Sequence, residues 1–166
     1  MTTRAKPSLD ELRATQALLQ KAHDYIEVNG FNIWAYGNRV RASGERCFIG
    51  SVRGVAGLNP CPPLDGDGKA DDGDGAELTY AFGVLDDLAK KRARARGVSL
   101  GTVVADHAPG WRIGRYVERY GIEFVEARIG EAPDKRRDEM AQEALLIFRR
   151  ALARVYKQIQ KAEAGS

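Results

Sequence analysis

Apolar residues recur at helical spacing in several stretches of the chain, and the first stretch has the clearest ends. The residues expected to face inward recur at intervals of seven: Leu12, Leu19 and Ile26. Ser8 stands just before this stretch and Glu11 follows three residues later, which is the spacing of a capping box. Gly30 stands where such a helix would end. The pattern predicts a helix over residues 9–28.

Two further helices are predicted in the second half of the chain. A helix over 76–96 has these residues inward: Leu78, Phe82, Leu85 and Leu88. A helix over 133–162 begins at Pro133, which suits a first turn, and carries a heptad seam: Leu145, Phe148, Leu152, Val155 and Ile159. At 1.5 Å per residue this helix extends about 45 Å, comparable with the diameter of the whole domain. It must therefore either cross the body as a core helix or protrude with its seam exposed.

Glycines at helical spacing mark the segment 47–57. As a helix, this segment would carry apolar residues on one face and glycines on another: Phe48, Val52 and Val55, against Gly50, Gly54 and Gly57. Each glycine costs a helix about 1 kcal/mol relative to alanine. The expected compensation is the close approach of another backbone to a surface without side chains. A glycine-rich loop is the alternative.

A short β-hairpin is predicted over residues 31–46. Its apolar and aromatic positions precede a polar turn at 42–45: Ile33, Trp34, Tyr36 and Val40. Two short strands are not stable alone, so they would lean on the helices. The predicted fold class is mainly α: a compact helical domain with a short β-hairpin and a long C-terminal helix.

Residues 17–57 resemble the opening of an uncharacterised domain-of-unknown-function family of actinobacteria and their phages. In that family an amphipathic helix ends in a glycine and an aromatic residue, and a polar turn then leads into a Cys-x-x-Gly segment. The matching residues here are Gly30 and Phe31, the turn 43–46, and Cys47 with Gly50. A second family feature is matched more loosely over 105–120. The resemblance implies a helical fold and no established activity.

The length of 166 residues fits a single domain over 1–166. We expect a flexible N-terminus over 1–7 and a flexible, acidic, glycine-rich loop over 58–75. The carboxylates of this loop suggest calcium, but an EF-hand register beginning at Asp65 places Lys69 at position 5 and Ala76 at position 12. A solvated loop is therefore the favoured interpretation.

The composition indicates a cytoplasmic protein with no membrane segment. The formal charge is only +3, and no apolar run approaches the roughly 18 residues that a membrane span needs. The polar residues 1–6 contain no apolar core of a leader peptide. Cys47 and Cys61 are too few for a disulfide framework, so we expect free thiols and a reducing compartment.

A cluster of positive charge lies in the segment 90–96. Five of its seven residues are basic: Lys90, Lys91, Arg92, Arg94 and Arg96. Such side chains can neutralise phosphates, which favours nucleic-acid binding. The same charges complement the negative end of a helix dipole and have acidic neighbours in Asp86 and Asp87, so a solvated helix end is the alternative.

Few residues suggest catalysis or metal binding. His23 stands next to Asp24 and His107 next to Asp106, and consecutive side chains point about 100° apart on a helix, so neither carboxylate is expected to orient its histidine. Two histidines without a paired ligand spacing predict no metal site, and nothing indicates a cofactor.

Three functional hypotheses follow. The first is a non-enzymatic domain that binds a protein partner, or a second copy of itself, through the seam of the C-terminal helix. The second is a nucleic-acid-binding module that uses residues 90–96. The third is an enzyme with a site near Asp106 and His107, completed by Trp34 and Tyr36, and it requires these side chains to meet in one pocket.

Overall fold

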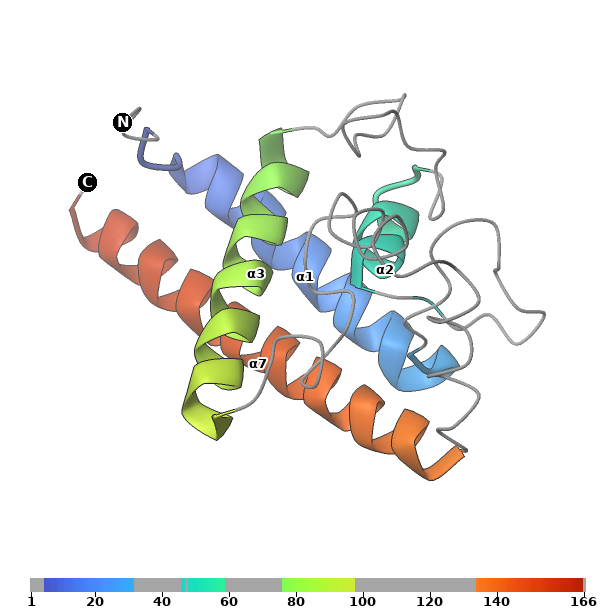
Figure 1. Cartoon of the computed structure of the whole chain (residues 1–166). Helices are drawn as coiled ribbons and strands as arrows, with labels where there is room; N and C mark the ends of the chain where they lie inside the picture. Colours follow the sequence, from blue (N-terminus) through green and yellow to red (C-terminus); the bar gives the residue numbers. More distant parts are fainter. Residues whose placement is uncertain (1–4, 32–45, 47, 59–75, 98–133, 166) are drawn as a thin grey trace, which may run out of the picture.

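Four helices form the part of the chain that the structure describes (Figure 1). The structure is a computed structural model, and it describes residues 5–31, 46, 48–58, 76–97 and 134–165. The helices are α1 (Leu9–Asn29), α2 (Phe48–Val55), α3 (Ala76–Arg96) and α7 (Asp134–Ala164). Within these residues no helix is both long enough and apolar enough to cross a membrane.

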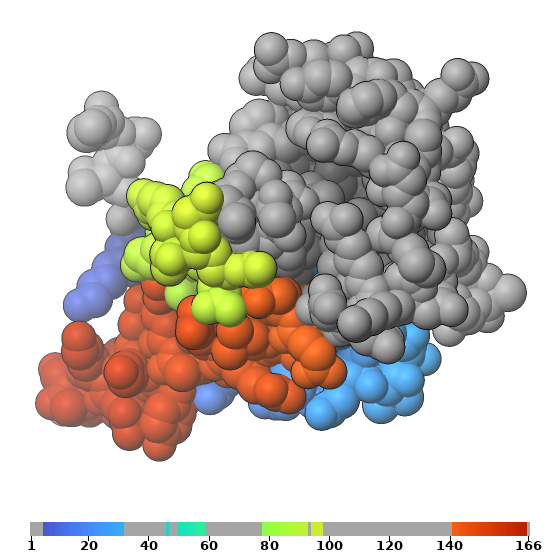
Figure 2. Space-filling view, turned by 60° about the horizontal axis from the view of Figure 1, so that its bottom comes forward, coloured from blue at the N-terminus to red at the C-terminus, as the bar shows by residue number. Residues whose placement is uncertain are grey.

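The long helices α1 and α7 lie side by side and run in opposite directions (Figure 1). Arg13, near the start of α1, donates to Glu163, near the end of α7, at 2.9 Å. The α3 helix crosses against both, and α2 packs mainly on α1. In Figure 2 the orange and red surface of α7 is bordered by the green surface of α3.

The predicted ends of α1 are confirmed. The Ser8 side chain accepts a hydrogen bond from the Glu11 backbone at 3.2 Å, and the Glu11 carboxylate accepts one from the Ser8 backbone at 2.7 Å. This capping box satisfies amide groups that the first helical turn leaves without partners. Gly30 ends the helix with a φ of 87°, a left-handed conformation that glycine adopts without steric cost.

The seam of α7 lies in the core. Four of its residues are buried, namely Leu145, Phe148, Val155 and Ile159, and Leu152 is partly buried against them. They belong to the same apolar cluster as Leu19 and Ile26 of α1 and Leu85 of α3. Of the two arrangements that the heptad pattern left open, the structure has the core helix.

The glycine-bearing segment is helical as predicted, but its glycines do not share one role. Gly57 follows the end of α2 with a φ of 81°, so it terminates the helix and does not extend a glycine face. Gly54 lies within α2, where a Cβ atom would clash with the Arg46 guanidinium. The group that approaches Gly54 is therefore a side chain, whereas we expected a backbone.

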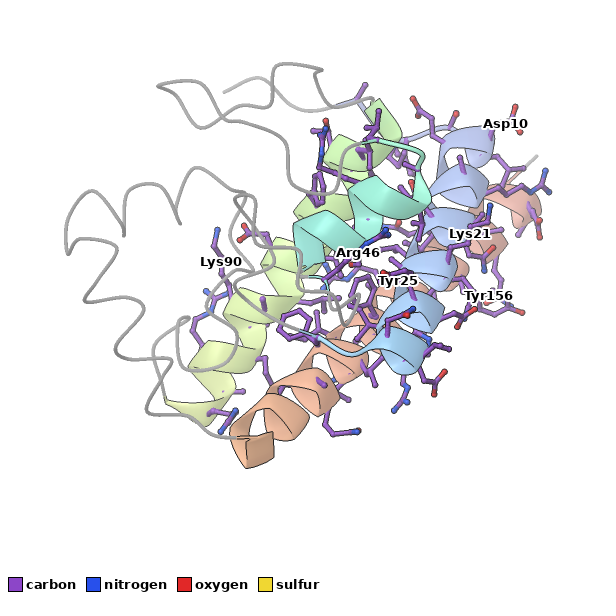
Figure 3. All side chains as sticks on the ribbon, turned by 90° about the vertical axis from the view of Figure 1, so that its right-hand side faces the viewer. Asp10, Lys21, Tyr25, Arg46, Lys90 and Tyr156 are labelled. Atoms are coloured by element: carbon purple, nitrogen blue, oxygen red, sulfur yellow. The ribbon has the colours of Figure 1, made fainter. Side chains whose placement is uncertain are left out.

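Arg46 is held between α2 and α1 (Figure 3). Its Cζ atom lies 4.0 Å from the centroid of the Tyr25 ring, which is cation–π geometry. Its Nε atom is buried and has no hydrogen-bond partner among the residues that the structure describes. The absence of a side chain at Gly54 thus leaves room for the guanidinium between α2 and the Tyr25 ring.

The predicted β-hairpin is not seen. The described residues contain no strand, and Phe31 and Arg46 form an isolated bridge in the parallel sense. The two strands of a hairpin pair in the antiparallel sense, so this bridge is not a remnant of one. The hairpin positions Ile33, Trp34 and Tyr36 lie outside the described residues, as do 59–75 of the predicted loop.

Candidate functional site

The basic segment at the end of α3 is paired with carboxylates from two helices. Lys90 and Lys91 bind Asp86 and Asp87 one turn earlier, with N–O distances of 2.6 and 3.3 Å. These are the acidic neighbours that the sequence offered, and such pairs at the surface of a helix are weak. The segment therefore carries less free charge than its composition suggests.

The arginines of the segment reach a carboxylate on α7. Arg92 donates through Nη2 and Nε to both oxygens of Glu143, at 3.0 and 3.2 Å. Arg96 donates to the same residue at 3.4 Å. The Arg92 and Glu143 side chains are only 27% and 19% exposed, so this two-pronged pair is more shielded than the lysine pairs. It joins the end of α3 to α7.

Asp87 makes a second connection between the same helices. Its Oδ2 atom accepts from Nη1 of Arg154 on α7 at 2.6 Å and lies 3.3 Å from the Lys91 nitrogen. One carboxylate oxygen is therefore shared by a cation from each helix. The hydrogen bond from Arg154, with a smaller contribution from Lys91, lowers the pKa of Asp87 below its usual value.

Basic residues form a straight row along α7. Glu143 is followed at intervals of seven, four, three and four by cations on the same flank of the helix: Arg150, Arg154, Lys157 and Lys161. Arg150, Lys157 and Lys161 are exposed. This row meets α3 at Glu143 and Asp87, through the pairs with Arg92 and Arg154. Figure 2 shows the surfaces of α3 and α7 side by side.

Together these residues form what we call the basic strip. It consists of Lys91, Arg92 and Arg96 of α3 and Arg150, Arg154, Lys157 and Lys161 of α7. Within the described part its carboxylates are Asp87 and Glu143, each of which already binds two cations. Arg92, followed by the charges of Arg96 and Arg150, lowers the pKa of Glu143. The strip therefore keeps an excess of positive charge.

The strip includes residues that sequence reasoning did not combine. Arg150, Arg154 and Lys157 lie on faces of α7 away from its buried seam. Nothing local indicated that α3 would dock beside them. A search for rows of like charge at intervals of three and four along α7 would have found the row, but not its junction with α3.

Four of the five seam residues offered as a partner site are not accessible in this fold, and Leu152 is partly buried. Phe148 and Val155 have no exposed surface, and Leu145 and Ile159 retain 5% and 6%. A partner could reach them only if α7 separated from α1 and α3. Among the described residues, the large hydrophobic side chains that are exposed are Val28 of α1 and Tyr156 of α7.

One group of possible metal ligands lies on α1. Donor atoms of His23, Asp24 and Glu27 fall within 4.8 Å of one another. Contrary to expectation, neighbouring residues do interact here, since Nδ1 of His23 lies 3.0 Å from a carboxylate oxygen of Asp24. This bond, followed by one from Gln20, lowers the pKa of Asp24. The two carboxylates are exposed, and exposed acidic groups commonly lie close together without an ion, so this group carries no functional proposal.

The enzyme hypothesis concerns residues outside the described part of the chain. Asp106 and His107 lie in 98–133, and Trp34 and Tyr36 lie in 32–45. Cys47 and Cys61 also fall outside it. Whether these side chains converge therefore remains a prediction of the sequence.

Comparison with known proteins identifies no relatives. No family model matches the chain, and no similar curated protein or solved structure was found. The resemblance of residues 17–57 to the actinobacterial and phage family therefore stays a prediction.

Proposed function

We propose that this protein binds nucleic acid through the basic strip. The observation that supports the proposal is the convergence of two charged segments from distant parts of the sequence. The basic end of α3 and the cationic row of α7 meet at Asp87 and Glu143. Their combined charge exceeds that of the two carboxylates, and phosphates are the common biological partners of such a surface.

The carboxylates of the strip organise it more than they neutralise it. Asp87 joins Lys91 to Arg154, and Glu143 joins Arg92 to Arg96. Each therefore holds cations from both helices, or from successive turns, in fixed positions. Lys157 and Lys161 extend beyond them and form no ion pair with any residue that the structure describes. Such lysines are available for phosphate contacts.

Association with a protein partner or a second copy through the α7 seam is the other proposal that the sequence raised. In the described packing this association requires α7 to leave the core, because the seam is covered by the other helices. Nucleic-acid binding through the basic strip requires no rearrangement. This difference in accessibility is why we favour the strip.

Charge reversal on α7 tests the proposal. We expect the double variant Lys157→Glu/Lys161→Glu to bind a labelled duplex of about 20 base pairs at least about tenfold more weakly than the native protein at about 50 mM salt, by fluorescence anisotropy. Both lysines are exposed, so the fold should persist, which circular dichroism would verify.

The matched control is Lys21→Glu. Lys21 is also an exposed helical lysine, but it lies on α1, away from α3 (Figure 3). Its reversal should change affinity by less than about twofold, apart from the general effect of net charge. Equal losses in both variants, or no binding by the native protein, would contradict the proposal.

A further inference from the structure

We infer that the basic strip takes the phosphate backbone of double-stranded nucleic acid and does not read its bases. This inference rests on the proposed function and names the partner more closely. It follows from the length of the strip, from its stiffness, and from the hydrogen bonds that most of its arginine side chains already donate to carboxylates.

The length of the strip suits a rod-shaped partner. From Glu143, where Arg92 and Arg96 of α3 are bound, to Lys161 the strip extends along α7 for about 27 Å, at 1.5 Å per residue. Base pairs stack at 3.4 Å, so this length corresponds to about eight base pairs. Because the row lies on one flank of a continuous helix, its charges follow a nearly straight line.

The strip is stiff and lacks a stacking platform among the residues described. Arg92 and Arg154 are fixed by Glu143 and Asp87, and the remaining cations stand on regular helix. Proteins that hold flexible single strands combine charge with aromatic side chains on which bases stack. The exposed aromatic residue of α7, Tyr156, lies on the other edge of the helix, on the side of Lys21 (Figure 3). A stiff duplex, whose phosphate strands wind about a straight axis, fits the strip better than a flexible single strand.

Most of the side chains best suited to reading bases are already engaged. Base recognition relies most often on the arginine fork, which binds guanine through two parallel hydrogen bonds. Arg92 uses two of its nitrogens on Glu143, and Arg154 donates to Asp87. Arg96 donates to Glu143, whereas Arg150 is exposed and forms no ion pair with the described residues. The other unengaged cations are Lys157 and Lys161, and a lysine ammonium acts as a point charge that suits phosphate. We therefore expect affinity without sequence preference.

Three probes test the inference with the full chain. They are a duplex of about 20 base pairs, one of its strands alone, and a second duplex of scrambled sequence and equal composition. Fluorescence anisotropy at one salt concentration should show the two duplexes bound within about twofold of each other. The single strand should bind at least about tenfold more weakly. Lys157→Gln/Lys161→Gln should weaken both duplexes by the same factor.

The possible failures are distinct. Equal or tighter binding of the single strand, or a tenfold difference between the duplexes, would overturn this inference and leave the proposed function standing. If none of the three probes binds, or if the lysine variant binds them all as the native protein does, the proposed function fails with it.

Discussion

Gly54 shows how one missing side chain decides a local arrangement. Glycine weakens a helix, yet at this position it leaves room for the Arg46 guanidinium. That guanidinium lies over the Tyr25 ring of α1, so Gly54 contributes to the contact between α2 and α1. The sequence pattern indicated that the glycines permitted a close approach, and the structure identifies the group that approaches Gly54.

A double-mutant cycle tests this role of Gly54. In an Arg46→Ala background, Gly54→Ala should raise the free energy of unfolding by about 1 kcal/mol, because alanine favours the helix. In the native background the new Cβ would displace the Arg46 guanidinium, because the Cζ atom of Arg46 lies only 2.7 Å from the position that an ideal Cβ at residue 54 would take. Loss of the cation–π contact should then cancel most of the gain, giving a coupling of about 1 kcal/mol.

Urea unfolding of the four proteins would measure that coupling. The two backgrounds should differ in their response to Gly54→Ala and share a common denaturant slope. Equal stabilisation by alanine in both backgrounds would show that Arg46 and Gly54 do not depend on each other.

At the scale of elements, the junction of α3 and α7 is held by charge as well as by apolar contact. Leu85 of α3 and Phe148 of α7 belong to the shared core. At the edge of this contact, Glu143 binds Arg92 with both carboxylate oxygens. The helices themselves follow from local pattern, whereas the partner of Arg92 is 51 residues away and has no local signal.

Replacing Glu143 tests the contribution of this junction to stability. Glu143→Gln keeps the shape of the side chain but removes its charge, and it should lower the free energy of unfolding at pH 7 by about 1 kcal/mol. Because Arg92 lowers the pKa of Glu143 below 4.5, the stabilisation is complete above pH 4.5 and is lost as the pH falls through the lowered value. The difference between the two proteins should therefore shrink in acid.

Urea unfolding between neutral and acidic pH would check this expectation. Glu163→Gln is a suitable control, because Glu163 and its partner Arg13 are about half exposed, and such pairs contribute only a few tenths of a kcal/mol. A difference between native protein and Glu143→Gln that stays constant below pH 4.5 would contradict the assigned ion pair.

At the scale of the whole molecule, most elements could be predicted and their assembly could not. The ends of α1 could be predicted from Ser8, Glu11 and Gly30, because these residues cap the helix through hydrogen bonds to groups only a few residues away. Heptad spacing identified which residues of α7 share a face, but periodicity does not indicate what covers that face. Burial of the seam therefore could not be predicted from the sequence and is known only from the structure.

The candidate site depended even more on assembly. Composition drew attention to residues 90–96, and the structure pairs four of those five cations with carboxylates. The cations of α7 become part of a larger basic surface only because α3 docks beside them. A hairpin was expected because aromatic residues stand near a turn. Short apolar segments of this kind occur in helices as well as in strands, so the pattern does not identify a strand.

The salt dependence of duplex binding tests the central claim most directly. About four phosphate contacts by the strip should give a slope of about −3.6 for the logarithm of affinity against the logarithm of salt concentration, and a loss of about a hundredfold between 50 and 200 mM. Lys157→Gln/Lys161→Gln should make the slope shallower by about 2, while Lys21→Gln should leave it unchanged. Binding that ignores salt, or a slope that the strip lysines do not affect, would contradict the account.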